Sequence, residues 1–278
     1  MKKIYKKALS FTTAAFIMYA VYGLLLFSCQ SKMIFPGQYM RKASPHVDTV
    51  LQKMANVKRV WLKVGDARIE AWYIAASKDI KNPPVVIYAH GNNELIDDHI
   101  EDLNKYSKYG INYMLVEFPG YGRSGGKSSL KSITGAFVKV YDWLVQKGGI
   151  DKDRIIVHGF SIGGGIACSL ASKRKVRALV LQNTFAYAGM MTKRYCLPGI
   201  FATDLFDNES LVKVFKGPIL ISHGRSDRII PYENSLKLHK VAKKSTFISY
   251  NCGHNGCPVD DEEYIRTIIK FLKDNNII

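Results

Sequence analysis

The chain has 278 residues, of which 47% are hydrophobic and 23% charged, and a formal net charge of +17. This composition excludes a disordered or collagen-like chain, and the length is ample for a large hydrophobic core. Five cysteines are too few for a fold held together by disulfides. The positive charge favours an anionic partner, either a membrane surface or nucleic acid, unless it only keeps the surface soluble.

The N-terminus has the pattern of a membrane anchor. Lysines at positions 2, 3, 6 and 7 precede an uncharged run over residues 8–31. As a helix this run would extend about 36 Å, enough to cross a hydrocarbon core of about 30 Å. We therefore expect residues 1–31 to form an uncleaved anchor, with the lysines on the cytoplasmic side and the rest of the chain outside the cytoplasm. A basic domain held at an anionic bilayer needs no nucleic acid to explain its charge.

Two other interpretations of this segment stay open. Residues 26–29, Leu-Phe-Ser-Cys, resemble a bacterial lipobox, in which Cys29 would be lipidated and become the new N-terminus, although Phe27 is bulky for that motif. A buried core helix is disfavoured, because no polar residues recur at helical spacing to give it a solvent-facing side. A lipoprotein is therefore the main alternative to the uncleaved anchor.

Beyond the anchor, short apolar runs alternate with helix-like patterns. Residues 57–64 and 67–76 are predicted to pair as a hairpin that turns at Gly65 and Asp66. Six further strands are predicted at 84–89, 111–116, 154–157, 178–181, 218–221 and 246–250. Helices are predicted between them at 96–109, 130–145, 162–172, 233–242 and 262–273. This alternation predicts an α/β fold, with a mostly parallel sheet and helices on both faces, as one domain over residues 32–278.

The sharpest motif is Gly-Phe-Ser-Ile-Gly at residues 159–163, between an apolar strand and the small-residue start of a helix. In that position G-x-S-x-G predicts a nucleophile elbow, in which glycines allow a strained turn that exposes the Ser161 hydroxyl. The N-terminus of the following helix would favour negative charge that develops there. A glycine-rich turn with a capping serine is the alternative.

A nucleophilic serine needs a histidine as general base and an acid that orients the histidine. In this fold class the chain order is serine, acid, histidine. Asp227 lies in a loop after the predicted strand at 218–221, and it is the predicted acid. Asp204 and Asp207 compete for this role, but no strand precedes them, so we interpret them as surface or capping residues.

Two histidines follow Asp227. His239 lies within a helical pattern, where a packed or solvated histidine is expected. His254 follows the predicted strand at 246–250, in a loop that can project back toward Ser161, and it is the predicted base. The remaining histidines precede Asp227 and are excluded by chain order: His46, His90, His99, His158 and His223.

Two backbone amides are predicted to stabilise the oxyanion of such a reaction. One is the amide of Ile162, directly after the nucleophile. The other is the amide of Asn92, in the loop after the third strand, where Gly91 allows the turn that faces it toward the site. We expect no cofactor and no metal.

These motifs together resemble those of the α/β-hydrolases, in particular a membrane-anchored branch similar to lysophospholipases and serine aminopeptidases. The resemblance rests on residues 30–36, 90–92, 118–124, 159–164, 183–185, 223–227 and 253–255. It implies Ser161 as nucleophile, Asp227 as acid and His254 as base, the same residues that chain order selects. Activities in this group include esterase, lysophospholipase and protein depalmitoylase.

We therefore expect a serine hydrolase that cleaves an ester or thioester of a small-molecule or lipid acyl substrate. An amidase or aminopeptidase is the enzymatic alternative, and a non-catalytic binding protein of the same fold is the other. Residues 182–217 are expected to form a short cap. Its apolar side chains could line an acyl pocket, contact lipid, or simply pack over the sheet: Tyr187, Met190, Met191, Tyr195, Leu197, Ile200 and Phe201.

Cys252 and Cys257 flank His254. A zinc site is disfavoured, because His254 is needed as the base and there is no evident fourth ligand. In an oxidising compartment a disulfide between the two cysteines is favoured, with two free thiols as the alternative. Cys168 and Cys196 are expected to be unpaired.

Overall fold

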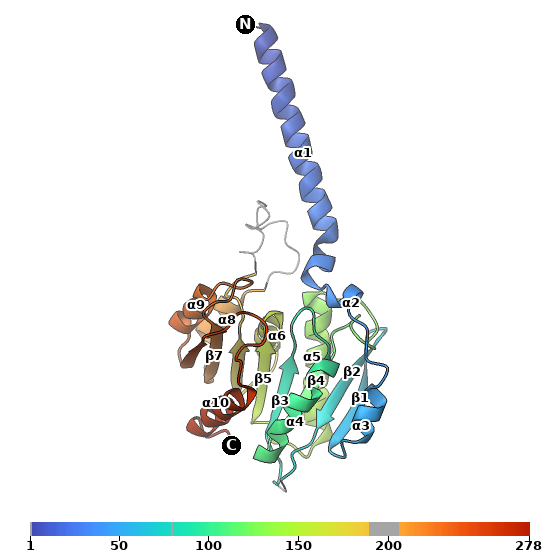
Figure 1. The fold of residues 1–278 in the computed structure, drawn as a ribbon, viewed down its shortest axis with the longest axis vertical. Coiled ribbons are helices and arrows are strands. Elements are labelled where there is room, and N and C mark those ends of the chain that lie inside the picture. Colours follow the sequence, from blue (N-terminus) through green and yellow to red (C-terminus); the bar gives the residue numbers. More distant parts are fainter. Residues whose placement is uncertain (1, 79, 189–205) are drawn as a thin grey trace.

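The structure, a computed structural model, describes residues 2–78, 80–188 and 206–278 (Figure 1). An eight-stranded sheet forms its centre, in the order β1-β2-β4-β3-β5-β6-β7-β8. The strands are β1 (Val57–Val64), β2 (Ala67–Ile74), β3 (Val85–Ala89), β4 (Asn112–Val116), β5 (Ile155–Phe160), β6 (Ala178–Gln182), β7 (Ile219–Gly224) and β8 (Ser245–Tyr250). The pairs β1–β2 and β2–β4 are antiparallel, and the other pairs are parallel. The predicted strands and the mostly parallel sheet are confirmed.

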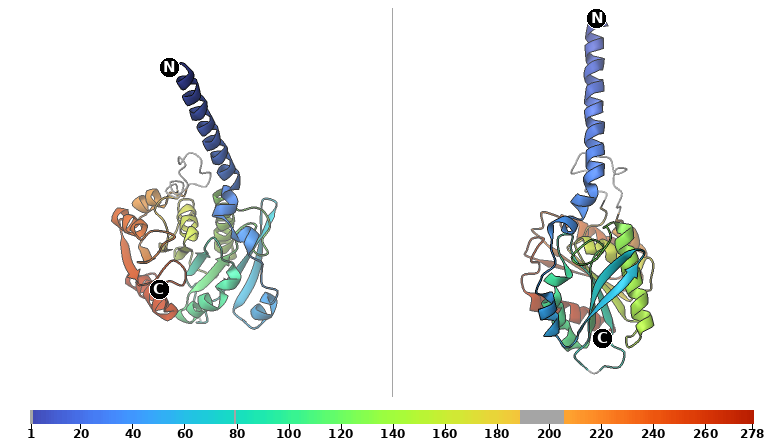
Figure 2. Two further views of the ribbon diagram at one scale, coloured as in Figure 1. Left: turned by 45° about the horizontal axis from the view of Figure 1, so that its top comes forward. Right: turned by 90° about the vertical axis from the view of Figure 1, so that its right-hand side faces the viewer.

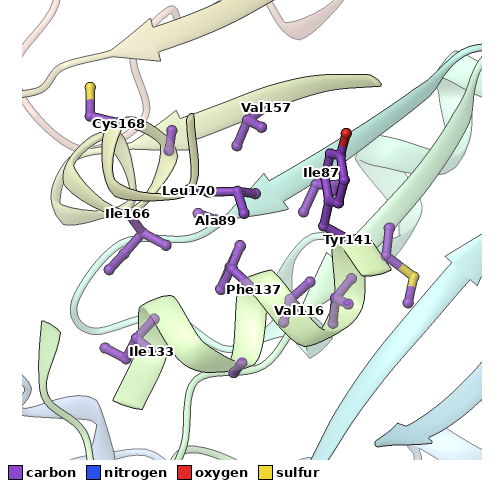
Figure 3. Close-up of a cluster of buried hydrophobic side chains, with 14 of the residues drawn as sticks. Ile87, Ala89, Val116, Ile133, Phe137, Tyr141, Val157, Ile166, Cys168 and Leu170 are labelled. Carbon is purple, nitrogen blue, oxygen red and sulfur yellow. The ribbon is translucent and has the colours of Figure 1, made fainter. Parts of the chain in front are cut away.

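Helices cover both faces of the sheet (Figures 1 and 2). One face packs against α5 (Leu130–Lys147), α6 (Ile162–Ala171), α8 (Asn208–Val214) and α9 (Glu233–Val241). The other packs against α3 (Val47–Gln52), α4 (Ile100–Asn104) and α10 (Asp261–Asp274). The central strands are apolar on both sides because each face has its own core. In Figure 3, Phe137 of α5 and Ile166 of α6 face Ile87 and Val157 of the sheet.

The region predicted as one helix over 96–109 forms three short segments instead. They are η1 (Ile96–Asp98), α4 and η2 (Lys105–Tyr109), of which η1 and η2 are 3₁₀-helices. The buried residues Ile100, Leu103 and Tyr106 recur every three positions. Ile100 and Leu103 lie on the α-helix α4 and Tyr106 on the 3₁₀-helix η2, so this spacing does not by itself predict where the helix type changes. The prediction also missed the short helices α2 (Gly37–Met40), α3 and α8.

The N-terminal helix α1 (Lys2–Ile34) projects away from the domain (Figures 1 and 2). Its stretch Leu9–Ile34 has a mean hydropathy of 1.8 and is long and apolar enough to cross a membrane. Most of the described side chains along it are exposed, so the domain does not cover its apolar surface. The next residue, Phe35, is fully buried in the core of the domain. The helix therefore ends where the chain enters the domain.

Candidate active site

Ser161 lies on a strained turn between β5 and α6. Its backbone has φ +54° and ψ −117°, a conformation that residues with side chains rarely adopt. The two glycines of the motif allow this turn by close packing. A Cβ at Gly159 would collide with the backbone of Gly163, and one at Gly163 would collide with the carbonyl of Ala89. The motif thus forms the sharp strand-to-helix turn that the sequence predicts.

The side chains of Ser161, His254 and Asp227 form a continuous chain of contacts. Ser161 Oγ lies 2.9 Å from His254 Nε2, and His254 Nδ1 lies 2.6 Å from Asp227 Oδ2. All three residues are buried, with exposed fractions of 7–8%. They follow β5, β7 and β8, which are parallel, so their carboxyl ends meet at one edge of the sheet. This topology brings together residues that are far apart in sequence.

The carboxylate of Asp227 is surrounded by donors. Its Oδ1 accepts the amides of Ile229 and Ile230, both at 2.8 Å. Its Oδ2 lies 3.2 Å from His223 Nε2, in addition to the contact with His254. Burial alone would raise the pKa of Asp227, but the bonds from His223, from His254 and from the Ile230 amide outweigh it and hold that pKa well below its usual range. Asp227 is therefore an anion at any pH near neutrality.

His223, which chain order excludes as the base, lies against Asp227. Its Nε2 also lies 2.9 Å from the carbonyl of Ile230, and since a carbonyl only accepts, Nε2 carries the proton. Its Nδ1 lies 2.6 Å from the Ser235 hydroxyl. His223 is fully buried, so these contacts fix its ring. Among the described residues it contacts Asp227, Ile230 and Ser235, and it makes no hydrogen bond to Ser161.

Gln182, the last residue of β6, and Thr184, two residues later, both hydrogen-bond to the backbone of Ser161. The carbonyl of Gln182 accepts the Ser161 amide at 2.9 Å, and the Thr184 hydroxyl donates to the Ser161 carbonyl at 2.7 Å. The Gln182 side chain also donates to the carbonyl of Cys257 at 2.7 Å, which links the elbow to the loop of His254.

Asn183 connects the loop of His254 to the end of β7, which precedes Asp227. Its side-chain amide donates to the carbonyl of His254 at 2.8 Å, and its side-chain oxygen accepts the Gly224 amide at 3.1 Å. Asn183 is 1% exposed and has φ +47°. No role for Asn183 was predicted from the sequence. The three consecutive polar residues 182–184, at the end of an apolar strand, could have indicated this cluster.

The two predicted oxyanion donors lie at the same edge. Ile162 begins α6, and Asn92 follows β3. Neither amide donates a hydrogen bond to any residue in the described part of the chain. Behind the loop of Asn92, the buried His90 ring lies 2.9 Å from the Glu117 carboxylate. Burial lowers the pKa of His90, but the charge and hydrogen bond of Glu117 outweigh it and raise that pKa overall.

His239 and Asp207, two other sequence candidates, make their hydrogen bonds elsewhere. His239 is in α9, where its Nδ1 lies 2.7 Å from the Ser245 hydroxyl. Asp207 caps α8 by accepting the Ser210 amide at 3.0 Å, as the capping interpretation predicts. Residues 189–205 of the predicted cap lie outside the described residues, and they include Asp204, Cys196, Met190, Met191, Tyr195, Leu197, Ile200 and Phe201.

Cys252 and Cys257 form a disulfide across the loop that carries His254, which confirms the favoured pairing. Their sulfurs are thereby unavailable as zinc ligands. Cys168 is free and buried in α6, and burial raises the pKa of its thiol. Over residues 2–78, 80–188 and 206–278, no group of three or more His, Cys, Asp or Glu residues could hold a metal ion.

Comparisons with known proteins agree with this fold. Residues 84–195 match a family model described as the alpha/beta hydrolase fold. The protein bem46 of Schizosaccharomyces pombe is 25% identical over 91% of this chain and 88% of its own length. The lysophosphatidylserine lipase ABHD12 of Rattus norvegicus is 27% identical over 72% of this chain, but the match spans only 55% of that protein. An esterase of Pyrococcus furiosus superposes with a TM-score of 0.67 at 20% identity, covering 81% of this chain and 93% of the esterase.

The chain has the α/β-hydrolase fold, and the family model together with these relatives supports its membership of the α/β-hydrolase superfamily. Its matches to named hydrolases are consistent with a serine hydrolase.

Proposed function

We propose that this protein hydrolyses an ester or thioester through an acyl-enzyme, with Ser161 as nucleophile, His254 as general base and Asp227 as the acid. The observation that carries the proposal is the unbroken line of contacts from Ser161 Oγ through His254 to Asp227, at 2.9 and 2.6 Å. This is the geometry by which a histidine removes the serine proton while a carboxylate holds its ring.

The reaction follows from these positions. As Ser161 Oγ attacks the acyl carbon, its proton passes to His254 Nε2, and the imidazolium is stabilised by the Asp227 anion. The carbonyl oxygen becomes an oxyanion, to which the amides of Asn92 and Ile162 donate. When the intermediate collapses, the alcohol or thiol leaves with the proton from Nε2. Water, activated by the same nitrogen, then attacks the acyl-enzyme and restores Ser161.

We infer that the substrate is a lipid or lipidated molecule held at a membrane. Helix α1 leaves the domain beside the edge that carries Ser161, because Gly37, three residues after the helix, contacts Asn92 of the oxyanion loop (Figure 1). A helix that spans a bilayer would therefore turn this edge toward the lipid. Tyr39, Met40 and Ile229, which lie near this edge, expose apolar side chains, as a surface that meets lipid headgroups would. A lysophospholipid or a palmitoylated protein fits such a site.

We propose that residues 1–31 anchor the protein and that residues 32–278 form the catalytic domain outside the cytoplasm. Lysines at positions 2, 3, 6 and 7 support this orientation by the positive-inside rule. The Cys252–Cys257 disulfide supports it independently, since disulfides persist in oxidising compartments. Lipidation at Cys29 would tether the domain at the same edge. The intact mass of the membrane-extracted protein distinguishes a full-length chain from one that begins at a diacylglyceryl-modified Cys29.

A fluorophosphonate probe tests the activity. The wild-type chain should be labelled at Ser161, and Ser161→Ala should not be labelled. A series of esters, thioesters and amides of increasing acyl length then defines the substrate. Faster turnover of amides than of esters would indicate an amidase, and absence of labelling in the folded wild type would indicate a binding protein.

A further inference from the structure

The peptide unit that carries the Asn92 amide is held by the ring of His90. The carbonyl of Gly91 lies 2.8 Å from His90 Nδ1 and accepts a hydrogen bond from that N–H. In a trans peptide the N–H points away from the carbonyl of the same unit, so this bond sets the direction of the Asn92 amide. His90 is fully buried, which leaves the ring little freedom to turn.

The next peptide unit is held by a different part of the chain. The carbonyl of Asn92 itself accepts two hydrogen bonds, one from the Gly37 amide at 3.2 Å and one from the Tyr121 hydroxyl at 2.7 Å. Asn92 is therefore held on both sides, by His90 through the preceding carbonyl and by Gly37 and Tyr121 through its own.

Gly37 belongs to residues 35–38, which we call the juxtamembrane segment because it directly follows α1. This segment is fastened to the domain at each end. Phe35 is fully buried, and the Gln38 side chain accepts the Ser128 amide at 2.7 Å. A Cβ at position 37 would collide with the Tyr121 ring, so the close approach to Asn92 requires glycine here.

We propose that the juxtamembrane segment and Tyr121, against which Gly37 packs, form one positioning element for the oxyanion hole. It holds the carbonyl of Asn92 so that the amide of the same residue stays directed at the substrate oxygen. This inference rests on the proposed function, in which Asn92 is an oxyanion donor. The segment that joins the anchor to the domain thereby forms part of the support for the transition state.

The variant Tyr121→Phe tests this proposal in the full-length protein in detergent. It removes the hydroxyl that donates to Asn92 and keeps the ring. Removing an oxyanion donor outright costs about 100-fold or more in kcat, so a misdirected donor should cost about tenfold. Because the amide acts in the transition state, KM for a soluble ester should stay unchanged. Affinity for a trifluoromethyl ketone, whose oxyanion occupies the same hole, should fall by a similar factor.

Tyr141→Phe is the matched control. Tyr141 is also buried, and its hydroxyl also donates to a backbone carbonyl, that of Lys175, at 2.7 Å. It lies on α5 and has no contact with Asn92. Its loss should lower thermal stability about as much as Tyr121→Phe does, with kcat and ketone affinity unchanged. A second variant, Gly37→Ala, should displace Tyr121 and reproduce the kcat loss; if it fails to fold, Tyr121→Phe carries the test alone.

Wild-type kcat and ketone affinity in Tyr121→Phe would overturn the proposal, as would an equal loss of both in Tyr141→Phe. The Ser161→Ala variant separates this failure from failure of the proposed function. If Ser161→Ala is inactive while Tyr121→Phe behaves as wild type, only the positioning role of Tyr121 and the juxtamembrane segment is wrong. If Ser161→Ala keeps full turnover, the proposed mechanism is wrong.

Discussion

The Nε2 atom of His223 lies 3.2 Å from Oδ2 of Asp227, the oxygen that also contacts His254 at 2.6 Å. Two imidazoles therefore meet at one buried carboxylate oxygen, while the other oxygen accepts two backbone amides. This environment stabilises the charged form of Asp227 in the folded protein, and it has a consequence for stability at low pH.

Asp227 should stabilise the fold above about pH 4 and lose this contribution in acid. Its pKa is lowered on folding, so its contribution is fully present above the unfolded pKa of about 3.9 and is lost as the pH falls through the folded pKa. Urea denaturation of wild type and Asp227→Asn measures this. The difference between their free energies of unfolding should shrink as the pH falls from about 5 to 2. A difference that stays constant over that range would mean that the carboxylate charge does not stabilise the fold.

Ser161→Ala should abolish fluorophosphonate labelling and reduce ester turnover to what the oxyanion hole and binding alone provide. His254→Ala should cost about as much in kcat, because the two residues act as one unit. The loss of kcat in each of the two variants is measured with a soluble ester, and circular dichroism checks that each variant is folded. Wild-type turnover by folded Ser161→Ala would rule out the acyl-enzyme.

His239→Ala should leave kcat nearly unchanged. Its ring contacts Ser245 and stacks on Phe247, with ring centroids 5.3 Å apart, and it makes no hydrogen bond to Ser161, Asp227 or His254. This variant is therefore the control for His254→Ala. A hundredfold loss of kcat in a folded His239→Ala protein would mean that the base has been assigned to the wrong histidine.

Asn183→Ala should lower both stability and kcat. The change leaves the buried carbonyl of His254 and the amide of Gly224 without this partner, at a cost of about 1–3 kcal/mol, and loosens the loop of the base. Alanine also disfavours the positive φ of this position. Asn276→Ala controls for that strain, because Asn276 has φ +52° but is exposed near the C-terminus. If both variants lose kcat equally, the bridge made by the Asn183 side chain is not the cause.

Deleting residues 1–31 should leave kcat on a small soluble ester nearly unchanged, because Phe35 and Gly37 remain. Hydrolysis of a substrate in anionic vesicles should fall, since tethering raises the local concentration of the enzyme. Added salt should weaken the residual binding of the truncated protein by screening its positive charge. The ratio of vesicle to soluble turnover is compared for the two proteins. An unchanged ratio would indicate a water-soluble substrate.

The order and type of most elements could be predicted from the sequence, and so could the candidate residues Ser161, Asp227 and His254. These depend on local signals: apolar runs of strand length, a glycine-rich turn, and the chain order that a parallel sheet imposes on loops at one edge. Residues 96–109 were predicted less well, because a single apolar periodicity does not distinguish one α-helix from short 3₁₀ and α segments.

The residues that hold Ser161, Asp227 and His254 in place can be identified only from contacts in the folded chain. His223 contacts Asp227, Asn183 joins Gly224 to His254, and Gly37 contacts Asn92 across 55 positions of the chain. None of these pairs has a signature in sequence spacing, because each depends on how separate loops meet at the carboxyl edge of the sheet. The direction of α1 relative to Ser161 has the same origin. The apolar run predicts a helix that can span a membrane, but the packing of Phe35 and Gly37 against the domain decides that it leaves beside the active-site edge.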